Sequence, residues 1–175
     1  MTKRTLPLLV ATAALALAAA TARAESFEVS LGLEPGGALS EYDGFDLDAG
    51  VFLGVGVPIT ADWKGELRLL AHDGDRLDVN TWQLGARTYF PTGVEWKPFA
   101  QGGLHYATRD YHPQGNFADR DDDGDFGVFA GGGVDWNATP RFALRFDGRL
   151  ALYDSDFSGG LETDVDLTAG AVFRF

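Results

Sequence analysis

After residue 24, apolar and polar side chains alternate along the chain with a period of two, and no long helical period occurs. The run from Phe27 to Leu33, for example, has Phe, Val and Leu at odd positions and Glu, Ser and Gly at even positions. A period of two places successive side chains on opposite faces of a strand. We therefore predict eight strands, at residues 27–33, 45–57, 63–72, 82–90, 96–106, 126–136, 142–152 and 165–175.

The connections between these strands alternate in length. Short connections are predicted at residues 57–62, 91–95 and 137–140. The connections at residues 34–44, 73–78, 109–125 and 154–164 are mostly longer and contain 16 acids but only three arginines. Short turns at one end and longer loops at the other are typical of an outer-membrane barrel. The sequence thus predicts an all-β fold, an eight-stranded antiparallel transmembrane β-barrel, which must close because no open edge is stable in lipid.

Alternation alone does not say which face meets the solvent, since a soluble lipocalin-type barrel also has eight strands but turns its apolar face inward. The positions of the aromatic residues decide between the two, because rings gather at both ends of the apolar face, as in the two interfacial girdles of membrane barrels. At the short-turn end these are Phe27, Trp63, Phe90, Trp96, Trp136, Phe142 and Phe175, and at the long-loop end Phe45, Trp82, Tyr106 and Phe126.

The polar face is rich in glycine and balanced in charge. Glycine is unfavourable in an exposed strand but suits a narrow eight-stranded interior, where large and small side chains share little space. Buried charges need partners, and equal numbers of acids and bases on this face predict an ion-pair network. The acids are Glu28, Asp46, Asp48, Glu66, Asp135, Asp147 and Asp166, and the bases are Lys64, Arg68, Arg87, Lys97, Arg145, Arg149 and Arg174.

The first 24 residues differ from the rest of the chain. Lys3 and Arg4 precede a short apolar run at residues 8–20, and residues 22–24 have the small-x-small form of a cleavage site. This is the three-part build of a secretory signal peptide, and the run is too short for a transmembrane helix. We predict a signal peptide at residues 1–24 and a barrel domain at 25–175. Without the signal, 26 acids face 11 bases, which argues against nucleic acid as a partner.

Together, the signal peptide, the eight alternating strands and the terminal Ala171-Val172-Phe173-Arg174-Phe175 resemble the small OmpA/OmpX-type outer-membrane β-barrels. Residues 97–106 resemble the fifth strand of that family. The resemblance implies a bacterial outer-membrane location, contact with membrane lipid and lipopolysaccharide, and delivery to the barrel-assembly machinery through Phe175. We expect a monomer. The family includes anchors, adhesins, enzymes and proteins of unknown role.

Candidate chemistry is sparse, and we expect no enzyme. His72 and His105 are predicted to face inward near the long-loop end, and neither lies beside a serine in the sequence. The arrangement of nucleophile, base and orienting acid that catalysis requires is missing. We expect a structural scaffold that presents acidic external loops. The alternatives are an adhesin or ligand-binding surface protein and, behind them, a narrow channel or a lipid-modifying enzyme.

One loop carries a possible metal motif, DRDDDGDF at residues 119–126. Asp119, Asp121, Asp123 and Gly124 match the first, third, fifth and sixth positions of an EF-hand loop, and Asp125 follows them. An EF-hand also needs a glutamate at position twelve and flanking helices, whereas here that position is Ala130 and the flanks are predicted strands. We expect no tightly bound cofactor, and we predict at most weak calcium binding by Asp119, Asp121, Asp123 and Asp125.

Overall fold

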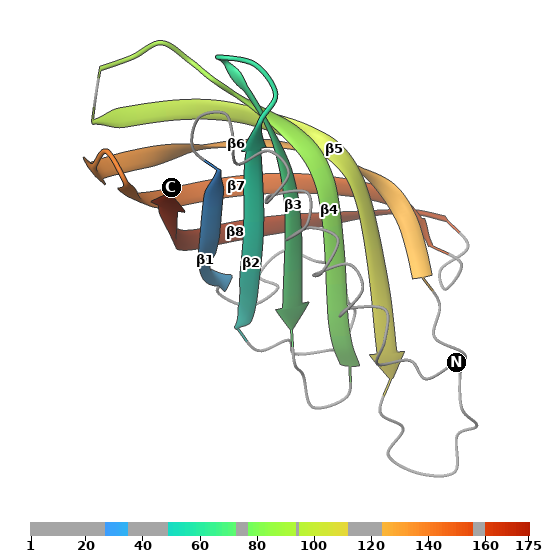
Figure 1. Cartoon of the computed structure of the whole chain (residues 1–175). Helices are drawn as coiled ribbons and strands as arrows, with labels where there is room; N and C mark the ends of the chain where they lie inside the picture. The colour runs from blue at the N-terminus through green and yellow to red at the C-terminus, as the bar shows by residue number, and fades with distance from the viewer. Residues whose placement is uncertain (1–26, 35–48, 73–76, 94, 112–123, 156–159) are drawn as a thin grey trace.

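The computed structural model describes residues 27–34, 49–72, 77–93, 95–111, 124–155 and 160–175. Its eight strands are β1 (Glu28–Glu34), β2 (Gly50–Pro58), β3 (Trp63–His72), β4 (Leu77–Tyr89), β5 (Trp96–Tyr111), β6 (Gly124–Thr139), β7 (Phe142–Ser155) and β8 (Gly160–Arg174). They form a closed barrel in sequence order, and every neighbouring pair is antiparallel. The predicted fold is confirmed (Figure 1). The predicted signal peptide lies outside the described residues.

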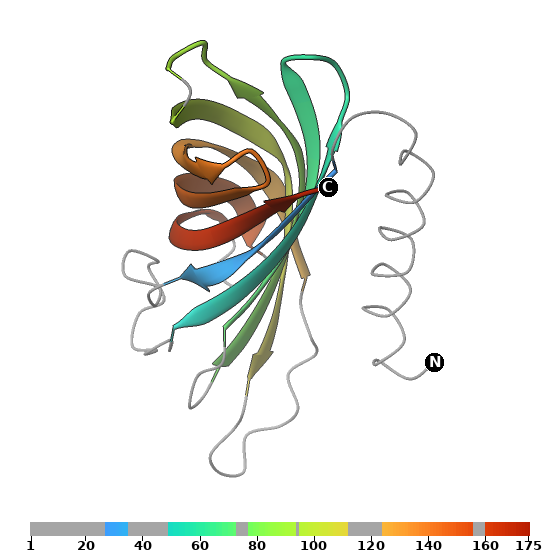
Figure 2. The same ribbon diagram turned by 60° about the vertical axis from the view of Figure 1, so that its left-hand side comes forward.

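β1 and β8 close the barrel (Figure 2). Leu31 pairs with Ala171 in the middle of this ladder. At its end, the backbone N–H of Phe175 donates to the carbonyl of Phe27 at 3.1 Å. The two phenylalanine rings stack with their centroids 4.7 Å apart. Both chain ends of the barrel domain therefore meet at the short-turn end, and the C-terminal phenylalanine helps to join the first and last strands.

No helix in the described part of the chain is long and apolar enough to cross a membrane.

The short connections are the ones the sequence predicts, and threonine hydroxyls organise two of them. The hydroxyl of Thr60 accepts the backbone N–H of Trp63 at 3.1 Å, and that of Thr139 accepts the N–H of Phe142 at 3.0 Å.

Several strands extend farther than predicted at the long-loop end. β4 begins at Leu77 instead of residue 82, and β5 continues to Tyr111 instead of ending at residue 106. β6, β7 and β8 gain residues at the same end, so Arg109, Asp125 and Asp164, which we expected in loops, are buried strand residues. The reason is that the outward positions there are polar, as at Asp154 and Thr163, although strand pairing continues. Beyond the lipid an outward side chain need not be apolar, so the alternation that reveals a strand disappears.

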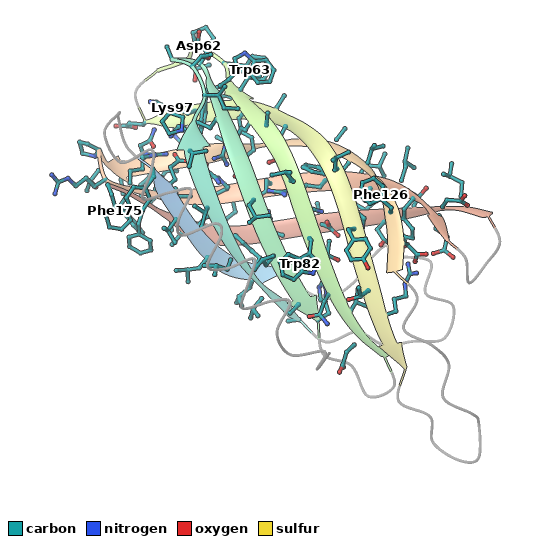
Figure 3. The ribbon with its side chains drawn as sticks, turned by 45° about the vertical axis from the view of Figure 1, so that its right-hand side comes forward. Asp62, Trp63, Trp82, Lys97, Phe126 and Phe175 are labelled. Atoms are coloured by element: carbon teal, nitrogen blue, oxygen red, sulfur yellow. The ribbon has the colours of Figure 1, made fainter. Side chains whose placement is uncertain are left out.

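The described outer face is apolar along the middle of the strands, which confirms the predicted orientation. The exposed side chains there are Leu31, Leu53, Leu84, Leu104, Val128, Phe146, Leu150 and Leu167. Aromatic residues flank this band, with Trp63 and Phe175 at the short-turn end and Trp82 and Phe126 toward the other end (Figure 3). Trp96 and Trp136 pair across β5 and β6 with ring centroids 6.3 Å apart. Phe45 of the predicted outer girdle lies outside the described residues.

Inward-facing glycines make room for inward-facing rings. A Cβ at Gly170 would lie 2.6 Å from the ring of Phe52, and one at Gly32 would lie equally close to it. A Cβ at Gly85 would lie 2.8 Å from the ring of Phe129. Real side chains do not approach that closely, so these glycines form notches that hold the rings. This confirms the sequence argument that glycine on the polar face reflects a narrow interior.

Candidate functional site

The centre of the barrel is crossed by an ion pair. Arg68 of β3 donates to Asp147 of β7 at 3.1 Å, and both side chains are buried. Asp147 also accepts bonds from Arg149 at 2.9 Å, from Gln101 at 3.1 Å and from Thr168 at 2.9 Å. The donors come from β3, β5, β7 and β8, so one carboxylate joins four of the eight strands.

A second layer of ion pairs lies toward the short-turn end. Glu28 accepts from Lys64 at 2.5 Å, from Arg87 at 2.7 Å and from Arg174 at 3.0 Å. Its carboxylate therefore connects β1 with β3, β4 and β8.

Asp135 on β6 completes this layer. It accepts from Arg145 at 2.7 and 2.9 Å, from Arg174 at 2.9 Å and from the Tyr89 hydroxyl at 2.9 Å. Arg174 thus bridges Glu28 and Asp135. Because the acceptor is a carboxylate, and all of the donors except the Tyr89 hydroxyl are also charged, these are charge-assisted hydrogen bonds, which are stronger than bonds between neutral groups.

Glu66 joins the two layers, because it pairs with Arg87 at 2.7 Å, with Arg149 at 2.8 Å and with Arg145 at 3.4 Å. The predicted interior network is therefore present, but its composition differs from the expected balance. Among the described residues, the connected ion pairs contain four carboxylates and six cations, namely Glu28, Glu66, Asp135, Asp147, Lys64, Arg68, Arg87, Arg145, Arg149 and Arg174.

Four members of the predicted network lie outside these connected ion pairs. Asp166 is buried in the lumen and accepts a hydrogen bond from the Gln83 amide at 3.1 Å, and Gln83 is also bonded to Arg149. Asp46 and Asp48 fall outside the described residues. Lys97 is exposed at the short-turn end. Its β6 neighbour Asp135, which the strand register offers as a partner, is already surrounded by Arg145, Arg174 and Tyr89. The prediction that Lys97 belongs to the interior network is therefore corrected.

A separate polar cluster lies at the long-loop end, inside the extended strands. Arg109 of β5 donates to Asp125 of β6, to the Tyr153 hydroxyl at 2.8 Å and to Glu162 of β8 at 3.4 Å. The Tyr153 hydroxyl in turn donates to Asp164 at 2.8 Å. These contacts fasten β5, β6, β7 and β8 to one another beyond the aromatic girdle. Sequence reasoning missed this cluster because its residues fall in segments that read as acidic loops.

Both described histidines face inward, as predicted. His105 stacks on Tyr153 with ring centroids 5.4 Å apart, and its Nδ1 lies 3.4 Å from the Gln83 amide. His72 Nε2 lies 3.6 Å from a carboxylate oxygen of Glu34. Both imidazoles are buried in the barrel wall, so neither is presented to the lipid face, where acyl chains would be reached.

The predicted calcium ligands divide into two groups. Asp119, Asp121 and Asp123 lie outside the described residues. Asp125 is buried inside the barrel and pairs with Arg109. Within the described ranges, no group of three or more histidine or carboxylate side chains is arranged to hold a metal ion. Calcium binding by the loop remains a prediction.

A closed barrel with an apolar exterior and a charged interior is the arrangement of an integral outer-membrane protein. The family model of the outer membrane protein beta-barrel domain matches residues 8–175, and the chain belongs to this family. The protein is located in the bacterial outer membrane. A search of curated proteins gives no match.

Solved structures of small outer-membrane barrels have the same fold. Neisserial surface protein A has 16% sequence identity and a TM-score of 0.69 over 85% of this chain and 97% of its own. Ail, the attachment invasion locus protein of Yersinia pestis, has 16% identity and a TM-score of 0.60 over 86% and 99%. OprG from Pseudomonas aeruginosa has 15% identity and a TM-score of 0.58 over 87% and 96%. At these identities the likeness concerns the fold alone.

Proposed function

We propose that this protein is a non-conducting scaffold of the outer membrane that holds acidic loops at the cell surface. The observation that carries the proposal is the bond between Arg68 and Asp147, which crosses the lumen between β3 and β7. Eight-stranded barrels have interiors just wide enough to be filled by side chains. Here the filling is a network whose members hold one another, so opening a path would break several charge-assisted bonds together.

Planar-bilayer recording tests the closed lumen. The purified barrel, refolded into a planar bilayer, should give no discrete current steps, whereas a large porin refolded in the same way serves as the positive control. Steady openings in the nanosiemens range would contradict the scaffold proposal and favour the narrow-channel alternative.

A recognition role is the second candidate, and the long-loop end favours it. β5 to β8 have 14 to 16 residues each, more than the roughly 9–11 residues that a tilted strand needs to cross a bilayer, so this part of the barrel wall extends beyond the lipid. The Arg109 cluster holds these extended strands together on the inside of the barrel. Rigid elements that carry variable loops are a common basis for recognition. One neighbouring structure, at 17% identity, is Ail in complex with the heparin analogue sucrose octasulfate. The acidic loops of this chain favour a cationic ligand instead.

A deletion strain distinguishes the two roles. It is complemented either with the natural chain or with a variant in which residues 112–123 are replaced by a short Gly-Ser linker, leaving β5 and β6 whole. If the scaffold role is the main one, both forms should restore resistance to envelope leakage. If recognition is the main role, cell attachment should be lost in the linker variant alone.

We propose no enzymatic role. The support is that His72 and His105 are buried among Glu34, Gln83 and Tyr153, away from the lipid face. Mass spectrometry of lipid A with and without expression should give the same acyl pattern, and a changed pattern would overturn this inference.

We further propose that the barrel is a monomer and that the assembly machinery recognises Phe175. Membrane lipid and lipopolysaccharide would surround the barrel.

A further inference from the structure

A cavity of about 1020 Å³ opens at the short-turn end of the barrel. All three described short connections border it, through Ala61 and Asp62, through Pro91 and Thr92, and through residues 138–140. Its floor is the outermost layer of the interior network, because Lys64, Tyr89, Asn137 and Arg174 also line it. This end is opposite to the proposed recognition surface, and in the family orientation short turns face the periplasm.

The charges around this cavity are mostly positive. Lys64, Lys97 and Arg174 line it, and Asp62 is the single carboxylate among the described lining residues. The interior below does not neutralise them, because the described ion-pair network and Asp166 together contain six cations and five carboxylates. At the other end, the carboxylates of Glu34, Asp125, Glu162 and Asp164 outnumber the one guanidinium of Arg109. The interior is therefore electrically polarised, with its positive end at this cavity.

Of the three cations that line the cavity, Lys97 is the one that is free to bind a ligand. It is exposed, and no hydrogen bond or ion pair joins it to any other residue that the structure describes. Figure 3 shows it with Asp62 and Trp63 at the mouth of the barrel. Lys64 and Arg174 line the same cavity with side chains that are 19% and 13% exposed and are held in place by Glu28. One free ammonium and two fixed cations in one cavity can bind an anion that has several oxygens.

We propose that this mouth is a binding site for a phosphate group. A phosphate offers oxygens in several directions and up to two negative charges, which fits three separated cations better than the planar, singly charged carboxylate does. The cavity is at the upper end of the usual range for small-molecule pockets, roughly 300–1,000 Å³, so it holds more than the bare ion. The phosphate has two available sources. One is a phosphorylated periplasmic solute, and the other is a phospholipid headgroup, since Trp63 and Phe90 on the rim lie in the aromatic belt at headgroup level.

Tryptophan indole resonances provide the test. The barrel labelled with ¹⁵N-tryptophan is refolded in maltoside micelles, which contain no phosphate, and titrated at constant ionic strength with glycerol phosphate or with dihexanoyl phosphatidylglycerol. The Trp63 resonance should shift in a saturable manner, while the Trp82 resonance at the far end should not. Shifts with both ligands indicate a solute site, and shifts with the lipid alone indicate a headgroup site. No saturable shift with either ligand would overturn the proposal.

Substitutions separate this site from general attraction to a positive surface. Lys97→Gln should weaken binding about tenfold or more, because a hydrogen bond to a charged group is lost. Arg141→Gln is the matched control, since Arg141 is exposed at the same end but does not line the cavity. It should change affinity less than about twofold, as expected for a remote surface charge. Equal losses in both variants would overturn the proposal. Heat-modifiable gel mobility confirms that each variant is folded.

Discussion

Arg68 and Asp147 form a hydrogen bond of 3.1 Å although their strands, β3 and β7, are four places apart in a closed ring of eight. No two strands of such a barrel can be farther apart around the ring. The lumen is therefore so narrow that one arginine and one aspartate side chain together span it. The barrel is held together by its ladders and also by links across its interior.

Replacing Asp147 should lower the free energy of unfolding more than replacing any other single carboxylate at the centre of the barrel. Asp147→Asn leaves Arg68 and Arg149 buried without their full countercharge, and breaking a buried pair in this way costs about 3–5 kcal/mol. The free energy of unfolding, measured by denaturant titration of the barrel in lipid vesicles, should fall by that amount. Asp154→Asn on the same strand is the control, because Asp154 is exposed. Equal effects would show that the cross-lumen network does not stabilise the fold.

Much of the fold could be predicted from the sequence, because lipid imposes a strict rule on half of the residues. Outward side chains within the bilayer must be apolar, and the alternation this produces identified every strand and its orientation. Beyond the lipid, outward side chains no longer need to be apolar. The alternation is therefore absent from the outer parts of β5 to β8, and the segments around Arg109 and Asp125 resemble loops in the sequence although they are paired strands.

The interior network could be predicted as a set but not as pairs. The direction in which a side chain faces follows from its position along a strand, so the alternation predicts that Glu28, Asp135 and Asp147 face the lumen. Their partners depend on strand tilt and on how far an arginine side chain reaches across the lumen. Arg68, for example, bonds to β7 and not to an adjacent strand. For the same reason the position of Lys97 outside the network could not be read from its strand alone.

The glycine notches give a second prediction. Gly170→Ala would place a methyl group 2.6 Å from the Phe52 ring and 2.5 Å from the carbonyl oxygen of Leu31. The backbone contact cannot move aside easily, and overpacking of this kind costs about 1–3 kcal/mol. The midpoint of denaturant unfolding should decrease accordingly. Gly160→Ala on the same strand is the control, because nothing lies within 4 Å of its added methyl group. A stable Gly170→Ala variant would show that the ring is not held by this notch.

Calcium calorimetry separates the loop aspartates from Asp125. If the loop binds calcium, the refolded barrel should show a dissociation constant of about 10⁻⁴–10⁻³ M, as weak extracellular sites do. Replacing Asp121 and Asp123 by Asn should abolish the binding heat. Asp125→Asn should retain it, because the Asp125 carboxylate is buried against Arg109. Heats that persist after the double replacement would remove the proposed site.

The depth of the lipid-facing band can be tested with single arginines. Leu104 lies on the outer face in the middle of β5 and is exposed, whereas Leu161 is exposed near the long-loop end of β8. Leu104→Arg should lower the free energy of unfolding in a bilayer by about 2–4 kcal/mol, because the charge is placed near the midplane. Leu161→Arg should cost at most about 1 kcal/mol, since a side chain near the interface reaches water. Denaturant titrations in vesicles measure both values. If the two substitutions cost the same, the lipid does not cover Leu104, and the apolar band identified on this barrel is not its membrane-spanning surface.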